Sequence, residues 1–221
     1  MSNSTRDQFN DLLRSEGLNA GIIPVSNIPN EESRLNEVNR LGILNRDLDQ
    51  EAQYNALTQL AAIITKSQIG LINILGSNIQ QCKTNFGFNV LESTLTEEMP
   101  REISICQYSL ASPQEPLIIN DLFLDERTKH FKKLEAYENL RFYAGSPLIS
   151  SRGFSIGTLC VIDDKPKKIE HDQIEGLRLL ADQVVNMLEQ EFNDNSNQNI
   201  DPEDISNVIE TNRITKYFST S

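Results

Sequence analysis

Three cysteines are the side chains of this sequence that are best suited to nucleophilic or redox chemistry. They are Cys82, Cys106 and Cys160, and they lie far apart along the chain. A cysteine reacts as its thiolate, and burial among apolar groups raises the thiol pKa. Cys160 lies in the apolar run from Ile156 to Ile162, so we interpret it as an inert core side chain. Cys106, in the sequence SICQYS, lies beside long connections, where a reactive thiol is an alternative to core packing, whereas Cys82 has no suggestive neighbours.

Other catalytic patterns are weak. His130 and His171 have no second His or Cys at metal-ligand spacing, so we expect no metal site. The glycine patterns that bind phosphate and the nucleophile elbow of hydrolases are absent from the sequence. We therefore predict no catalytic residue and identify no cofactor.

The composition limits the classes of function. With 221 residues, of which 38% are hydrophobic, the chain can bury one ordinary globular core. A net charge of −12 disfavours nucleic acid, and we interpret the basic clusters at residues 127–133 and 165–168 as solvated surface. An odd number of separated cysteines favours a reducing compartment, and neither a signal peptide nor a membrane span is apparent. We expect a cytoplasmic protein that binds no membrane.

Hydrophobic periodicity predicts the elements that must position these side chains. We expect helices over residues 30–44, with Asn30 as N-cap, over residues 48–66 and over residues 169–192. Between them we expect a hairpin of residues 69–77 and 79–87 with its turn at residues 76–78, a helical turn near residues 96–104, a strand at 116–122, an irregular or helical segment at 125–140, and a second hairpin of residues 142–150 and 155–163. This order predicts an α+β fold in which helices cover one face of an antiparallel sheet.

The ends of the chain differ in composition from its middle. Residues 1–30 form a polar arm with a short helix at residues 6–14, whose apolar residues could lie against the domain. Residues 193–221 form a polar linker and a short tail with a possible amphipathic helix.

Five segments resemble a GAF domain of the subgroup that precedes histidine kinases and diguanylate cyclases. They are EESRLNEVNRLGIL, LTQLAAIITKSQIGLINIL, PREISICQYSL, PLIINDLFLDER and RFYAGSPLISSRGFSIGTLCVIDDKP. The resemblance implies a GAF domain over residues 31–192, here stand-alone, with a six-stranded antiparallel sheet. It also implies N- and C-terminal helices on one face of that sheet and a ligand pocket on the other.

The resemblance further implies a set of ligand-binding residues. They are Cys106, Tyr108, Asp121, Asp125, Arg127, Arg141 and Tyr143. A carboxylate that faces an arginine fork can clamp an anionic or zwitterionic ligand. Alternatively, the two aspartates cap turns and the arginines tie down their loop. Where the subgroup often has Cys-x-His, this chain has Cys106-Gln107-Tyr108, which replaces a group that titrates near neutral pH by a hydroxyl.

The function that this resemblance implies is sensory and non-catalytic. An unknown small molecule would bind in the pocket, and the signal would pass to a separate partner such as a histidine kinase of a two-component system or a cyclic-dinucleotide enzyme. The helices at residues 48–65 and 173–192 could also form a homodimer. One alternative is an enzyme of the free-methionine-(R)-sulfoxide reductase type that uses a pocket cysteine. Another is a structural dimerisation module without a ligand.

Overall fold

The structure of this chain is a computed structural model that describes residues 3–48, 51–87 and 98–198. Contacts between Cα atoms divide the chain into two compact units, Met1–Val185 and Asn186–Ser221. The sheet and the candidate site belong to the first unit. The predicted amphipathic helix near the C-terminus lies outside the described residues.

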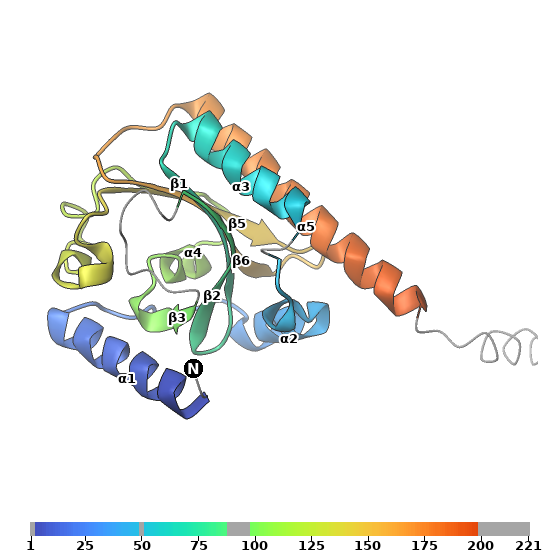
Figure 1. Cartoon of the computed structure of the whole chain (residues 1–221), viewed down its shortest axis with the longest axis horizontal. Helices are drawn as coiled ribbons and strands as arrows, with labels where there is room; N and C mark the ends of the chain where they lie inside the picture. Colours follow the sequence, from blue (N-terminus) through green and yellow to red (C-terminus); the bar gives the residue numbers. More distant parts are fainter. Residues whose placement is uncertain (1–2, 49–50, 88–97, 199–221) are drawn as a thin grey trace, which may run out of the picture. The chain divides into compact units, whose positions relative to one another are not determined.

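The described residues contain a six-stranded antiparallel sheet with the strand order β3-β2-β1-β6-β5-β4 (Figure 1). The strands are β1 (Ile69–Leu75), β2 (Ile79–Phe86), β3 (Glu98–Pro100), β4 (Leu117–Ile119), β5 (Phe142–Ile149) and β6 (Ser155–Asp163). Both predicted hairpins are confirmed, because β1 pairs with β2 and β5 pairs with β6, each in antiparallel register. Pairing of β1 with β6 joins the two hairpins, so the four long strands form the centre of the sheet.

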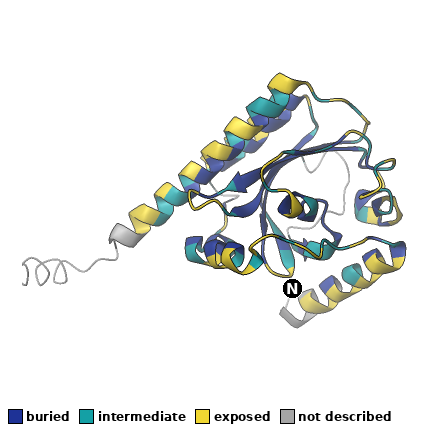
Figure 2. Ribbon diagram, turned by 180° about the vertical axis from the view of Figure 1, so that it is seen from behind, coloured by how far each residue is buried: buried dark blue, intermediate teal, exposed yellow. Residues whose placement is uncertain are grey.

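One face of the sheet is covered by helix α3 (Ala52–Thr65) and by the first part of α5 (His171–Gln198). The two helices lie side by side over the strands in Figures 1 and 2, with their outward faces exposed. Gly70 permits close packing of α3 on β1, because a Cβ at this position would collide with the backbone carbonyl of Thr58. The predicted arrangement of helices on one face is confirmed, and α5 continues beyond its predicted end to Gln198.

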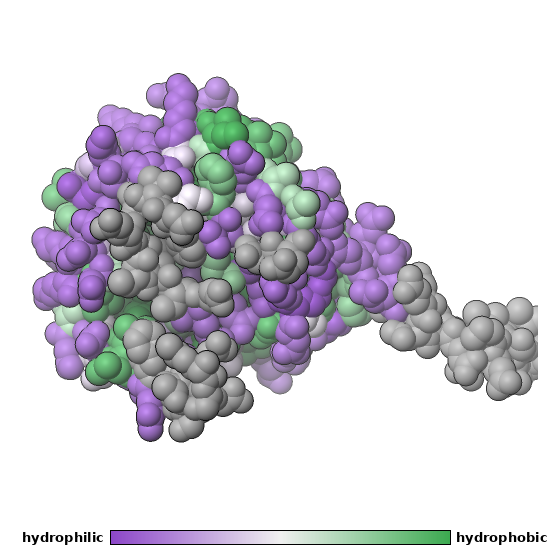
Figure 3. Space-filling view, in the orientation of Figure 1, coloured by the Kyte–Doolittle hydropathy of each residue, from purple (hydrophilic) through white to green (hydrophobic). Residues whose placement is uncertain are grey.

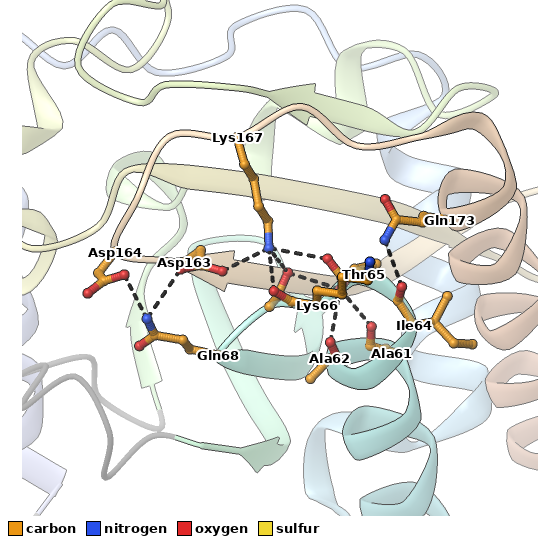
Figure 4. Close-up of polar contacts among 11 residues, drawn as sticks. Ala61, Ala62, Ile64, Thr65, Lys66, Gln68, Asp163, Asp164, Lys167 and Gln173 are labelled. Atoms are coloured by element: carbon orange, nitrogen blue, oxygen red, sulfur yellow. Dashed lines mark hydrogen bonds and ion pairs between the residues drawn. The ribbon is translucent and has the colours of Figure 1, made fainter.

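Lys167 ties the C-terminal end of α3 to the end of β6 (Figure 4). Its ammonium group donates to the carbonyl oxygens of Thr65 and Lys66 at 3.2 and 2.9 Å, and to Asp163 Oδ2 at 2.8 Å. A cation is favourable at this position because the last carbonyls of a helix carry partial negative charge. The interpretation of residues 165–168 as solvated surface is therefore wrong for Lys167, whose side chain is only 22% exposed.

Helix α2 (Glu31–Leu41) is fastened to the sheet by Arg34, which is 2% exposed. The guanidinium group pairs with Glu31 at 2.6 Å and donates to the carbonyl oxygens of Leu75 at 2.7 Å and Ser155 at 3.3 Å. Asn30 occupies the predicted N-cap position with φ of 52°, but its side chain makes no capping hydrogen bond. The cap position was correctly predicted, whereas the expected side-chain bond is absent.

Helix α1 (Asn3–Ala20) is longer than the predicted helix at residues 6–14 and lies beside β3, away from α3 (Figure 1). A Cβ at Gly17 would collide with the side chain of Ile103, so the helix packs tightly here. Of the apolar side chains of the arm, Ile22 is buried, but Leu12 and Ile23 are exposed. The expectation that these side chains lie against the domain is confirmed for Ile22 and for Leu13, which packs against the core, and is wrong for Leu12 and Ile23.

The remaining connections are short helical turns on the face of the sheet opposite α3. They are η3 (Arg101–Ile103), α4 (Gln107–Ala111), η4 (Phe131–Lys133) and η5 (Glu135–Tyr137), whereas the turn η1 (Ile43–Asn45) contacts α2. The ambiguous segment at residues 125–140 is thus irregular, with two 3-10 turns. Among the described residues, no helix has the length and the apolar character needed to cross a membrane.

Candidate functional site

A cavity of about 30 Å³ lies on the face of the sheet opposite α3, under η3 and η5. A cavity needs roughly 10–15 Å³ to hold one water molecule, so there is room for a solute of only a few atoms. All three cysteines contribute to its wall. The polar and sulfur-bearing side chains of the lining are Asn73, Gln80, Cys82, Met99, Ser104, Cys106, Tyr137, Tyr143 and Cys160.

The register of the central strands brings two of the cysteines to the cavity. Asn73 in β1 lies opposite Cys82 in β2, and Leu71 in β1 lies opposite Cys160 in β6. Residues two apart on a strand share a face, so Leu71 and Asn73 point to the same side of β1. Cys106, the N-cap residue of α4, lies on the cavity face of the sheet and lines the cavity from the side opposite the strands.

Asn73 links two of the sulfur atoms. Its Nδ2 lies 3.5 Å from Sγ of Cys106 and 3.4 Å from Sγ of Cys160. The Oδ1 atom of the same amide is buried and has no hydrogen-bond partner among the described residues. A buried amide oxygen without a partner costs about 1–3 kcal/mol, so this atom favours a hydrogen-bond donor inside the cavity.

Tyr143 contacts the Cys106 sulfur from the other side. Its hydroxyl donates to Sγ of Cys106 at 3.3 Å. Gly145 leaves space for this hydroxyl, because a Cβ at residue 145 would overlap the Tyr143 phenol. Burial raises the pKa of Tyr143 well above its ordinary value, and the negative charge of a Cys106 thiolate raises it further. The phenol therefore keeps its proton and remains a donor.

The two buried thiols are driven to opposite protonation states. Burial opposes ionisation of Cys106 and is the largest single effect, but interactions with the side chains of Cys160, Thr158 and Tyr143, in that order, outweigh it and lower the Cys106 pKa to about 6. Interaction with Cys106 is the largest cause of the raised pKa of Cys160, followed by burial. The two shifts favour ionisation of Cys106 and retention of the proton on Cys160.

The segment that carries Cys106 is held by a second group of hydrogen bonds. The backbone N–H of Cys106 donates to Oγ of Ser104 at 3.0 Å, and that hydroxyl donates to Oε1 of Gln80 in β2. The hydroxyl of Tyr137 donates to the carbonyl oxygen of Ile103 at 2.9 Å. These bonds connect the segment to the sheet below it and to η5 beside it, which fixes the position of the sulfur.

Of the seven predicted ligand-binding residues, the structure places Cys106 and Tyr143 in the lining of the cavity. Tyr108 lies outside it, where its hydroxyl donates to the carbonyl oxygens of Ile23 at 3.2 Å and Arg127 at 2.8 Å. Burial is the main reason why the pKa of Tyr108 rises to about 12. This tyrosine therefore joins the N-terminal arm to the loop after β4.

The four charged residues pair with one another outside the lining. Arg141 forms a bidentate pair with Asp121 at 3.0 and 2.6 Å, and Arg127 forms one with Asp125 at 2.9 and 2.6 Å. The hydrogen bonds with the paired arginines are the main cause of the lowered pKa of each aspartate. Each aspartate also accepts from a backbone N–H two residues later, as the capping alternative requires. A ligand role for these four residues stays a prediction.

Sequence reasoning missed Asn73, Cys82 and Cys160 as members of one site. Cys160 is fully buried, as expected, but it is not surrounded only by apolar groups, because the Asn73 amide and Cys106 contact its sulfur. The available signal was the single polar residue Asn73 within the apolar run of residues 69–75. A buried polar side chain in such a run indicates a neighbouring polar partner.

Comparison with known proteins identifies proteins that are similar to this chain in sequence or in fold. The family model described as GAF domain matches residues 49–188. A cyclic di-GMP phosphodiesterase of Pseudomonas aeruginosa is 29% identical over 137 residues, which are 62% of this chain and 22% of that protein. The chain therefore spans about one fifth of the length of this relative.

Two solved structures are similar in fold. A domain of a two-component sensor histidine kinase protein from Sinorhizobium meliloti has a TM-score of 0.52 and 15% identity, with 67% of this chain and 97% of that chain covered. A type II free methionine-R-sulfoxide reductase from Thermoplasma acidophilum has the same TM-score and identity, with 63% and 92% covered. At this identity the similarity establishes the fold and no shared activity.

Proposed function

This chain belongs to the GAF domain family, and from that premise we propose that it is a non-catalytic sensory domain that binds a small molecule in the cavity beside Asn73. The observation that carries this proposal is the buried Oδ1 of Asn73, which has no partner among the described residues. A ligand with one hydrogen-bond donor would satisfy this atom. The size of the cavity favours a solute of a few non-hydrogen atoms over a nucleotide.

The proposed route of the signal begins at the Cys106 segment, because the N-terminal arm is bonded directly to it. The backbone N–H of Val25 donates to Oε1 of Gln107 at 2.8 Å, and Tyr108 donates to the carbonyl oxygen of Ile23. A ligand that shifts the segment would change both bonds. If the ligand binds one position of the Cys106 segment more tightly than the other, binding shifts the population toward the position that it prefers.

The proposed partner is a signalling protein such as a histidine kinase of a two-component system or a cyclic-dinucleotide enzyme. The names of the Sinorhizobium and Pseudomonas relatives support these two classes. Three free thiols are consistent with a cytoplasmic location. Exposed Leu60 and Ile63 of α3, over which Figure 3 has a small hydrophobic area, support a homodimer through this helix.

The test is native mass spectrometry of the purified chain, which detects a small molecule that remains bound. We expect a bound mass that is retained in the Asn19→Ala variant, whose amide is exposed, and lost in Asn73→Ala. Circular dichroism of each variant would verify folding. An unliganded wild-type protein whose melting temperature responds to no member of a panel of small polar solutes would contradict the proposal.

The reductase alternative has one observation in its favour, which is the presence of three thiols around a single cavity. Free methionine sulfoxide has about ten non-hydrogen atoms, which is too many for a cavity of about 30 Å³ without expansion. Reduction of free methionine sulfoxide by the wild type, lost in Cys106→Ser, would favour the enzyme over the sensor.

A further inference from the structure

We propose that Cys106 and Cys160 form an oxidant-reactive thiol pair, in which Cys106 attacks hydrogen peroxide and Cys160 converts the product into a disulfide. The geometry that points to this pair is the shared contact with Asn73, whose Nδ2 lies within 3.5 Å of both sulfur atoms. Both sulfur atoms therefore lie on the same side of β1, within reach of one amide group. The inference goes beyond ligand sensing, because it assigns covalent chemistry to the cavity and needs no other ligand.

The size of the cavity selects the oxidant. Cys106 is 3% exposed and Cys160 is fully buried, and both line the cavity, so the cavity is where an oxidant would meet the sulfur atoms. A volume of about 30 Å³ accepts a solute of water-like size. Hydrogen peroxide meets this limit, whereas an organic hydroperoxide with a bulky substituent does not.

The groups around Cys106 suit it to be the attacking sulfur. The Tyr143 hydroxyl and the Asn73 amide both donate to it. The other titratable groups in the described lining are Cys82 and Tyr137. No Asp, Glu, Lys, Arg or His contributes to that lining, so neutral donors and not an ion pair stabilise the thiolate.

The reaction balances with one peroxide molecule as the oxidant. The Cys106 thiolate attacks one peroxide oxygen, the O–O bond breaks, and the sulfur becomes a sulfenic acid while the other oxygen leaves as hydroxide. The Cys160 thiol gives its proton to that hydroxide to form water. Its thiolate then attacks the Cys106 sulfur, an S–S bond forms, and the S–O bond breaks. The released hydroxide takes a proton from solvent and becomes the second water molecule.

The net result is oxidation of two thiols to one disulfide and reduction of one peroxide to two waters. A dithiol reductant would return the pair to its starting state by thiol–disulfide exchange. Cys82 lines the same cavity but, unlike the other two cysteines, is partly exposed on β2. It provides a matched internal control.

The test begins with the unaltered protein. The chain is treated with hydrogen peroxide, its remaining thiols are alkylated under denaturing conditions, and its peptides are mapped without reduction. We expect a disulfide between Cys106 and Cys160, a mass loss of two hydrogens, and an alkylated Cys82. Oxidation of Cys82 before Cys106, or unchanged Cys106 under conditions that oxidise free cysteine, would overturn the inference.

Three variants assign the roles. Cys160→Ser should stop at the sulfenic acid, detected as a gain of one oxygen and by reaction with dimedone, and Cys106→Ser should form neither product. Cys82→Ser should behave like the wild type. Equal reaction with cumene hydroperoxide would contradict selection by the cavity. If a variant does not fold, the map of the wild type still decides, and loss of ligand binding would leave the peroxide result unaffected.

Discussion

The Tyr143 hydroxyl donates to Sγ of Cys106 at 3.3 Å and so connects a central strand to the segment that precedes α4. This contact depends on Gly145, two residues along β5, which leaves room for the phenol. A tyrosine whose pKa is raised remains a donor across the physiological range, so the Cys106 thiolate keeps this hydrogen bond.

Replacing Tyr143 by phenylalanine should raise the pKa of Cys106, because the thiolate loses one of its donors. A hydrogen bond to a charged group contributes about 1.5–3 kcal/mol, so the pKa should rise by about 1–2 units. The pH dependence of the ultraviolet absorbance of the thiolate measures the change. Tyr108→Phe is the matched control, since its hydroxyl lies outside the cavity and should leave the Cys106 titration unaltered.

The rate at which Cys106 reacts with peroxide should depend on pH. With a pKa of about 6, the reactive thiolate predominates above that pH and is lost as the pH falls below it. The rate should therefore increase about tenfold between about pH 5 and about pH 7 and then level off. Peptide mapping at timed quench points measures it, and a rate that still rises steeply above about pH 8 would indicate an ordinary thiol.

Replacing Arg34 by alanine should destabilise the fold strongly. The change removes the buried donor to the carbonyl oxygens of Leu75 and Ser155, and each unsatisfied buried acceptor costs about 1–3 kcal/mol, whereas Glu31 keeps its pair with Arg101. Urea unfolding measures the loss. Arg178→Ala removes an exposed pair with Glu175 and should change the unfolding midpoint little. Similar midpoints for the two variants would contradict the structural role of Arg34.

Replacing Lys167 by methionine should lower the free energy of unfolding by about 1–3 kcal/mol. The ammonium group bonds to carbonyl oxygens at the end of α3 and to Asp163, and methionine retains most of the chain length without donating. Thermal unfolding followed by circular dichroism checks the result. Lys165→Met, at an exposed position of the same connection, serves as the control and should be close to the wild type.

Much of the fold could be predicted because local patterns encode it. The apolar run of residues 69–75 and the hairpin around residues 151–153 were correctly predicted as strands, since runs of β-branched residues and turn signals depend on neighbours in sequence. The side-chain bond of Lys167 was missed, because the carbonyl groups that it contacts belong to a helix about one hundred residues earlier.

The candidate site was only partly predictable for the same reason. Cys106 and Tyr143 were expected at the pocket through family resemblance and do line the cavity, whereas Asp121 and Arg141 pair with each other beyond it. Nothing local distinguishes an aspartate that caps its own loop from one that faces a ligand. Asn73 and Cys160 could be assigned to the site only from the register between β1 and β6, which places both side chains at the cavity.

By itself, the sequence determined an α+β order of elements, because periodicity and turn residues act over short distances, and its five segments carried the resemblance to GAF domains. Only the tertiary structure decided that Cys106 and Cys160 share the amide of Asn73. Their chemistry depends on this proximity, since a thiol becomes reactive through the donors that surround its sulfur. Those donors come from β1, β5 and β6, which are brought together by strand pairing.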